Sequence, residues 1–195
     1  MSRDVLNAIG QAQPGIQKYL ALMDMFGTVD VADNRTFQRA YNGFYRVKQR
    51  TPLWYETYYR FMEKGKGLAP TFSDTLDHLH LATGRYEPSF ASKLVATLNP
   101  DRPVWDAHVL RNLGAKAPAY YSRTKIHDAK NCYAEINNWY QSFLASAEGA
   151  EWLGLFDEHV PQHAKLTNIK KLDFILWQMR DEGANQSPRS SSSPC

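Results

Sequence analysis

Apolar side chains recur every three or four residues along most of this chain, which is the spacing of amphipathic helices. The first run lies within residues 36–50, where aromatic side chains dominate the apolar positions. A second helix is expected to begin at Pro52, because proline is tolerated in the first turn of a helix. Gly65 and Gly67 are expected to end it.

The middle of the chain has clear start and stop signals for helices. Thr71 or Ser73 can cap a helix that Gly84 is expected to stop. The next helix is expected over residues 88–98, where apolar residues recur every four positions. Two prolines stiffen the connection after it, and a further helix is expected to stop at Gly114.

Two more helical patterns follow, over residues 128–149 and 167–180, and no segment alternates in the manner of a strand. The pattern therefore predicts an all-α protein with a single compact helical domain over residues 1–181. Residues 182–195 are polar and low in complexity, so a disordered Ser/Pro-rich tail is expected there.

Composition narrows the class of protein. The chain has 195 residues, of which 43% are hydrophobic and 22% charged, as in ordinary globular proteins. Its net charge of +3 permits contact with phosphate groups. Two cysteines do not make a disulfide framework, so a reducing cytoplasm is expected. No apolar run is long enough to span a membrane, and no Gly-rich phosphate loop indicates nucleotide-driven chemistry.

Two residues in the segment 89–114 are candidates for catalytic side chains. On a helical wheel Lys93 lies off the stripe formed by Phe90 and Leu94, so it is expected to face a groove or solvent among small neighbours. Asp106 precedes an apolar-periodic segment and is expected to be a helix N-cap. Taken singly, these residues are a surface lysine and an ordinary cap.

Together they resemble the helix-hairpin-helix DNA glycosylases. The sequence PVWDAHV, residues 103–109, is similar to the family pattern P-V-D-x-H-V around an essential aspartate, with Trp105 added before Asp106. FASKL, residues 90–94, matches the lysine-bearing run of archaeal-type 8-oxoguanine glycosylases. The hairpin of the family is Gly-rich, whereas the corresponding turn here has Gly84 alone.

The resemblance implies an all-α glycosylase fold with a helix-hairpin-helix-like segment at about residues 72–114 and a cleft between two helical lobes. It implies that Lys93 is the nucleophile and Asp106 the acidic partner in excising an oxidised purine, with β-lyase activity. The implied partner is double-stranded DNA with a damaged base, with no cofactor and no metal. A monomer acting in the cytoplasm at the nucleoid would fit.

Further residues are candidates for contact with DNA. Basic and hydroxyl side chains near the motif could contact the DNA backbone: Arg85, Ser89, Ser92, Arg102, Arg111 and Lys116. Trp105 and Phe90 are candidates for the base pocket, and Trp105 fits the core equally well. An alternative function is a non-catalytic helical module on the same scaffold that binds nucleic acid or protein.

Overall fold

The computed structural model describes residues 2–179. Nine α-helices and one 3-10 helix lie within this range. In chain order they are α1 (Ser2–Phe26), α2 (Arg35–Tyr45), α3 (Pro52–Leu68), α4 (Phe72–Thr83), α5 (Pro88–Leu98), α6 (Ala107–Asn112), α7 (Lys125–Leu144), α8 (Ala147–His159), η1 (His163–Lys165) and α9 (Asn168–Gln178). The described residues contain no β-strand, so the all-α prediction is confirmed for them.

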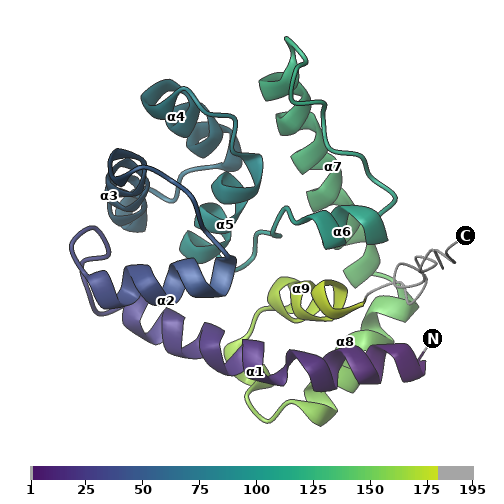
Figure 1. The fold of residues 1–195 in the computed structure, drawn as a ribbon. Helices are drawn as coiled ribbons and strands as arrows, with labels where there is room; N and C mark the ends of the chain where they lie inside the picture. The colour runs from purple at the N-terminus through teal and green to yellow at the C-terminus, as the bar shows by residue number, and fades with distance from the viewer. Residues whose placement is uncertain (1, 180–195) are drawn as a thin grey trace, which may run out of the picture.

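Figure 1 shows how the helices surround α5 and α9. The long helix α1 runs along one side of the molecule and packs against α2, α8 and α9. Helices α3 and α4 pack against α5, and α6 and α7 lie on the other side of the figure. The helices α6, α7 and α8 each pack against α9, so α9 is enclosed as α5 is.

The expected start and stop signals of the middle helices are confirmed. Thr71 is the N-cap of α4, and its hydroxyl accepts a hydrogen bond from the backbone amide of Asp74. The Asp74 carboxylate accepts the backbone amide of Thr71 in return, which completes a capping box. Gly84 ends α4 with φ of 69°, a left-handed conformation that favours glycine. Helix α5 begins at Pro88, as expected.

One stop signal was read wrongly. Helix α3 continues through Gly65 and Gly67 to Leu68 and ends with Ala69 in the left-handed conformation. Gly65 is inside the helix because Leu98 packs directly on it: an added Cβ would lie 2.5 Å from Leu98 Cδ1. This glycine therefore permits the close approach of α3 and α5, and it does not end a helix.

Two helices were not predicted at all. Helix α1 contains Pro14 together with Gly10 and Gly15, residues that interrupt a helical pattern in sequence. Its buried face, which includes Val5 and Ile16, packs into the core, and that packing outweighs the weak local propensity. Helix α8 was also missed. The expected tail, residues 182–195, and the domain end at residue 181 lie outside the described residues.

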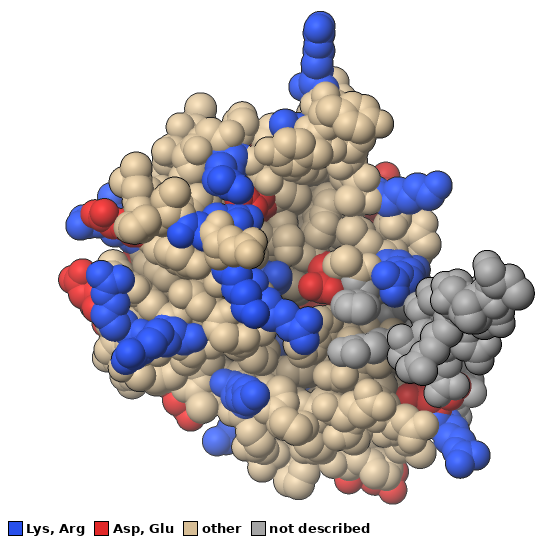
Figure 2. Space-filling model, in the orientation of Figure 1, with Lys and Arg blue, Asp and Glu red and all other residues tan. Residues whose placement is uncertain are grey.

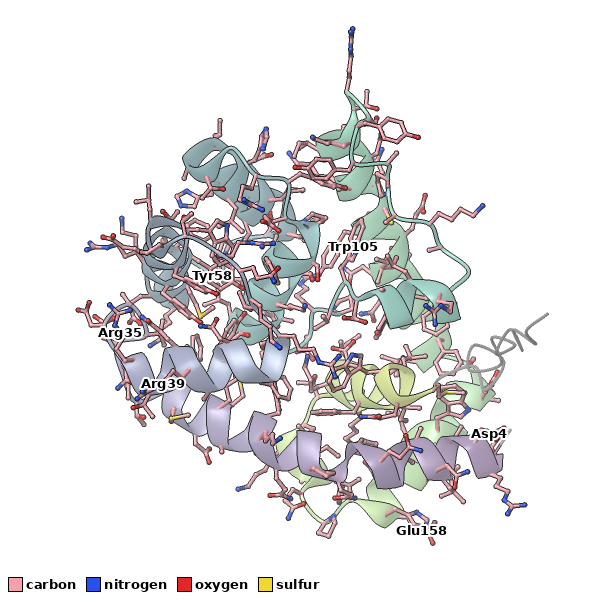
Figure 3. The ribbon with its side chains drawn as sticks, in the orientation of Figure 1. Asp4, Arg35, Arg39, Tyr58, Trp105 and Glu158 are labelled. Atoms are coloured by element: carbon pink, nitrogen blue, oxygen red, sulfur yellow. The ribbon has the colours of Figure 1, made fainter. Side chains whose placement is uncertain are left out.

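An aromatic cluster connects the helices that carry the candidate site. Tyr41 of α2 and Tyr58 of α3 are fully buried, with 2.7 Å between their hydroxyl oxygens. The Tyr58 hydroxyl also donates to the backbone carbonyl of Phe90 in α5, at 2.9 Å. Tyr58 lies among the inward-pointing side chains in Figure 3. The cluster thus fixes α5, the helix of Lys93, relative to α2 and α3.

Candidate functional site

Lys93 lines a cavity, in keeping with its expected position facing a groove, but its side chain is buried and does not face open solvent. Lys93 is only 8% exposed to solvent. Neighbouring elements cover α5 on nearly all sides, so residues 91–97 are all buried. Burial lowers the pKa of Lys93, because the charged amine loses hydration. Asp106 opposes this shift as a nearby negative charge, and Arg46 adds to it as a nearby positive charge, so the pKa remains below the ordinary lysine value.

Lys93 and Asp106 line the same cavity, which has a volume of about 200 Å³. Residues of α2, α6 and α9 also line the cavity, together with Arg46, directly after α2, and Val104, in the connection between α5 and α6. The full set is Phe44, Tyr45, Arg46, Lys93, Val104, Asp106, Ala107, Val109, Lys170, Asp173, Phe174 and Trp177. Figure 2 shows Lys and Arg side chains gathered across the middle of one face, beside a hollow that contains an acidic side chain.

Asp106 immediately precedes α6, and its carbonyl accepts the backbone amide of Leu110 at 2.9 Å, which closes the first helical turn. The connection that leads to it is fixed at several points. The Thr167 hydroxyl donates to the carbonyl of Pro100 at 2.7 Å, and the Tyr133 hydroxyl donates to the carbonyl of Pro103 at 2.9 Å. The position of Asp106 is therefore set by α7 and α9 as well as by the prolines.

Ser92 and Trp105 contribute to the same anchoring. The backbone amide of Trp105 donates to the Ser92 hydroxyl at 2.9 Å, and that hydroxyl donates to the carbonyl of Ser89. Ser92 is fully buried, so the interpretation of Ser92 as a DNA contact is wrong for this structure. Its hydroxyl instead connects α5 to the residue before Asp106.

Trp105 belongs to the core and is absent from the cavity lining, which corrects its interpretation as a base-pocket residue. Its ring lies nearly parallel to that of Phe72, with centroids 6.1 Å apart. Phe72 in turn stacks on Tyr133 of α7. Figure 3 shows Trp105 between α5 and α7. Phe90 is partly buried, with the Lys93 Nζ atom 5.2 Å from its ring centroid.

A buried ion pair in α9, missed by sequence reasoning, also lines the cavity. The Lys170 Nζ atom donates to the Asp173 carboxylate at 2.8 Å, and the hydroxyl of Tyr140 donates to the same carboxylate at 2.6 Å. Burial is the largest single influence on Lys170 and would lower its pKa, but the attraction of Asp173, the hydrogen bond to that carboxylate and the nearby Tyr45 and Tyr19 hydroxyls together raise the pKa above the ordinary lysine value. The available signal was a lysine and an aspartate three residues apart, which places them on one face of a helix that also carries the apolar residues Ile169, Leu172 and Leu176.

Aromatic rings form much of the remaining wall. Phe44 of α2 and Phe174 and Trp177 of α9 line the cavity, and the guanidinium of Arg46 lies 5.4 Å from the centroid of the Trp177 ring. Arg46 ends α2 in the left-handed conformation, with φ of 55°. The site therefore combines flat apolar surfaces with buried charged groups, which is the usual composition of a small-molecule site.

The remaining predicted DNA contacts lie in separate places. Arg85 is exposed beside Ser89 at the α4–α5 turn, where it forms an ion pair with Glu87 at 2.9 Å. Arg102 is exposed and lines a second depression with Asn99 and residues of α4 and α7. Arg111 and Lys116 are exposed in and after α6. None of these four basic residues lines the cavity of Lys93.

No protein-family model, curated protein or solved structure matches this chain. Within residues 2–179, none of the helices is both long enough and apolar enough to cross a membrane. The function is therefore argued from the site alone.

Proposed function

We propose that this chain is a DNA glycosylase with β-lyase activity that removes an oxidised purine such as 8-oxoguanine through a Schiff base on Lys93. The observation that carries the proposal is the placement of Lys93 and Asp106 on one cavity, with the pKa of Lys93 lowered by burial. A buried amine beside a carboxylate is the pairing that a lysine nucleophile requires. An ordinary surface lysine would have neither the burial nor the partner.

The proposed chemistry follows from these two groups. The neutral Nζ atom of Lys93 attacks C1′ of the sugar, and the electron pair of the glycosidic bond leaves with the base, which takes up a proton. The Asp106 carboxylate stabilises positive charge on the sugar and accepts a proton from the amine. Displacement of the base gives a glycosylamine in which the sugar ring is still closed. The C1′–O4′ bond then breaks, O4′ takes up a proton, and the nitrogen lone pair forms the C=N bond of the Schiff base. Loss of a C2′ proton from this open-chain Schiff base expels the 3′ phosphate, which nicks the strand.

The cavity walls support a planar heterocycle as the bound group. The damaged base must leave the duplex to expose its glycosidic bond, and the site that receives it must replace stacking and hydrogen bonding. Phe44 and Trp177 offer flat apolar surfaces, and the Lys170–Asp173 pair offers a charged donor and an acceptor on the same wall. This combination would suit a purine better than an aliphatic substrate.

Borohydride trapping on a duplex that contains 8-oxoguanine tests the proposal. Wild type is expected to form a covalent adduct, and Lys93→Ala is expected to form none. Lys165→Ala, a substitution at an exposed lysine, is the matched control and should trap as wild type does. Asp106→Asn should lose base release by about two orders of magnitude or more. If Lys93→Ala forms the same amount of adduct as wild type, Lys93 is not the nucleophile.

The alternative function gives a different result in the same experiment. A non-catalytic module would bind the duplex with strong salt dependence, would not distinguish the lesion, and would form no adduct or strand break.

A further inference from the structure

The stretch from the start of α6 to the first turn of α7 is strongly basic. Residues 107–127 contain Arg111, Lys116, Arg123 and Lys125 and no aspartate or glutamate. Figure 1 shows this connection running along α7 to its N-terminal end, at the side of the molecule farthest from α1. The cavity of Lys93 is lined by none of these four side chains, so they have no part in the site described above.

The connection ends in a β-turn with two exposed tyrosines. The backbone amide of Ser122 donates to the carbonyl of Ala119 at 3.0 Å, which places Tyr120 and Tyr121 at the two central positions. Such positions favour proline, glycine, asparagine or aspartate. Here Tyr120 is 68% exposed and Tyr121 is 91% exposed. Neither the turn geometry nor the core accounts for two aromatic rings at these positions.

The turn of residues 119–122, called the tyrosine turn below, is held in place from two sides. The Lys125 Nζ atom donates to the carbonyl of Tyr120 at 3.0 Å and lies 4.5 Å from the centroid of its ring. The ring of Tyr86, from the α4–α5 connection, meets the Tyr120 ring edge-on with centroids 5.9 Å apart. Tyr120 therefore supports the turn, and Tyr121 projects from it.

The nearest acidic group in the following sequence is already engaged. The Asp128 carboxylate accepts the Thr124 hydroxyl at 2.7 Å and the Ser122 hydroxyl at 3.4 Å, which fixes the start of α7. Lys116 precedes the tyrosine turn in sequence, Arg123 follows it directly, and both side chains are exposed. Exposed aromatic rings and basic side chains on one segment are the groups with which proteins stack on nucleic-acid bases and bind the adjoining phosphates.

We propose that the tyrosine turn is a nucleic-acid contact in which Tyr121 stacks on an unpaired base while Lys116 and Arg123 bind the adjoining phosphates. Residues 114–125 contain no leucine, isoleucine, valine, methionine or phenylalanine, so the segment lacks the aliphatic side chains with which a membrane-binding loop inserts into lipid. The positive charge complements a polyanion.

The inference deepens the proposed function and rests on its claim that the chain binds DNA. A glycosylase that rotates one base out of the duplex leaves a partner base unpaired, and an exposed ring can stack on it. The inference does not depend on the chemistry of Lys93, because stacking requires no bond to be broken.

The test measures binding of a lesion-free single-stranded oligonucleotide that carries 2-aminopurine, by fluorescence anisotropy and by quenching of the 2-aminopurine. Wild type is expected to quench the fluorophore on binding. Tyr121→Ser should weaken binding about 5- to 150-fold and remove the quenching, and Tyr121→Phe should retain both. Leu81→Ser is the matched control, since Leu81 is also an exposed large apolar residue, at 85%. Arg123→Gln should reduce the salt dependence of binding by about 0.7 in the log–log slope.

Wild-type affinity and quenching in both Tyr121→Ser and the double variant Tyr120→Ser/Tyr121→Ser would overturn the inference. So would loss of binding to phosphatidylserine vesicles without loss of binding to the oligonucleotide. Circular dichroism of each variant verifies that the fold is intact. The two proposals fail separately. Absence of any trapped adduct in wild type would remove the nucleophile and leave the tyrosine turn untouched, whereas wild-type binding and quenching in Tyr121→Ser would remove the tyrosine turn and leave the nucleophile untouched.

Discussion

Replacing Asp173 by alanine tests how the charged wall of the cavity is held together. The Asp173 carboxylate accepts hydrogen bonds from Lys170 and Tyr140, and both donors are buried. Asp173→Ala leaves the Lys170 ammonium, in a residue 3% exposed, without its ion-pair partner. It also leaves the Tyr140 hydroxyl without its acceptor.

The expected cost follows from these two consequences. Breaking a buried ion pair by removing one partner costs about 3–5 kcal/mol, because a charge remains buried without compensation. This is a large part of the roughly 5–15 kcal/mol by which domains are stable. Lys170→Met/Asp173→Leu removes both charges and leaves mainly the Tyr140 hydroxyl unsatisfied, so it should cost about 1–3 kcal/mol. The double variant should therefore be more stable than Asp173→Ala.

Urea unfolding followed by far-ultraviolet circular dichroism measures these differences. With a slope of about 1–3 kcal/mol per molar, a loss of about 3–5 kcal/mol should lower the urea midpoint of Asp173→Ala by roughly 1–5 M. The reasoning would be refuted by a loss below about 1 kcal/mol in Asp173→Ala. It would equally be refuted by a double variant that loses as much stability as the single one, because the buried charge would then not be the cause.

Two further substitutions test local packing and the burial of Lys93. Gly65→Ala should destabilise the fold by about 1–3 kcal/mol, because the added Cβ would lie 2.5 Å from Leu98 Cδ1. At Gly67 an added Cβ meets no atom within 4 Å, so Gly67→Ala should stabilise α3 by about 0.5–1 kcal/mol. Lys93→Met should be more stable than wild type at neutral pH. Because the folded pKa of Lys93 is lowered, wild type gains stability as pH rises toward the ordinary lysine range, so the advantage of Lys93→Met should shrink there. Thermal unfolding of the two glycine variants, and unfolding of wild type and Lys93→Met across pH, give the comparisons.

The helices that could be predicted are those bounded by recognisable capping residues. Thr71 and Gly84 bound α4 through a capping box and a left-handed glycine, and both signals are local in sequence. Helix α1 has no such signal, and Pro14 lies in its interior. It is helical because its apolar face packs against the neighbouring helix α2 and against α8 and α9, which are distant in sequence.

The candidate site was partly predictable for a similar reason. Lys93 and Asp106 were found from a short motif, but the burial of Lys93 was missed because a helical wheel assumes one apolar face and one solvated face. Helix α5 is enclosed by several elements, so residues off its apolar stripe are buried as well. Lys170 and Asp173 were missed because their significance depends on the cavity that α2, α6 and α9 form together.

The cavity has two buried lysines whose pKa values move in opposite directions, and this difference supports separate roles for them in the proposed reaction. For Lys93, burial outweighs the attraction of Asp106, and the amine is more easily deprotonated than an ordinary lysine. For Lys170, the attraction and hydrogen bond of Asp173, together with Tyr45 and Tyr19, outweigh burial and raise the pKa, so the ammonium keeps its charge. A nucleophile must be neutral, whereas a donor to an electronegative atom of a ligand benefits from a fixed charge. In the proposed reaction, Lys93 would therefore be the lysine that attacks the substrate, and Lys170 would be the one that holds it.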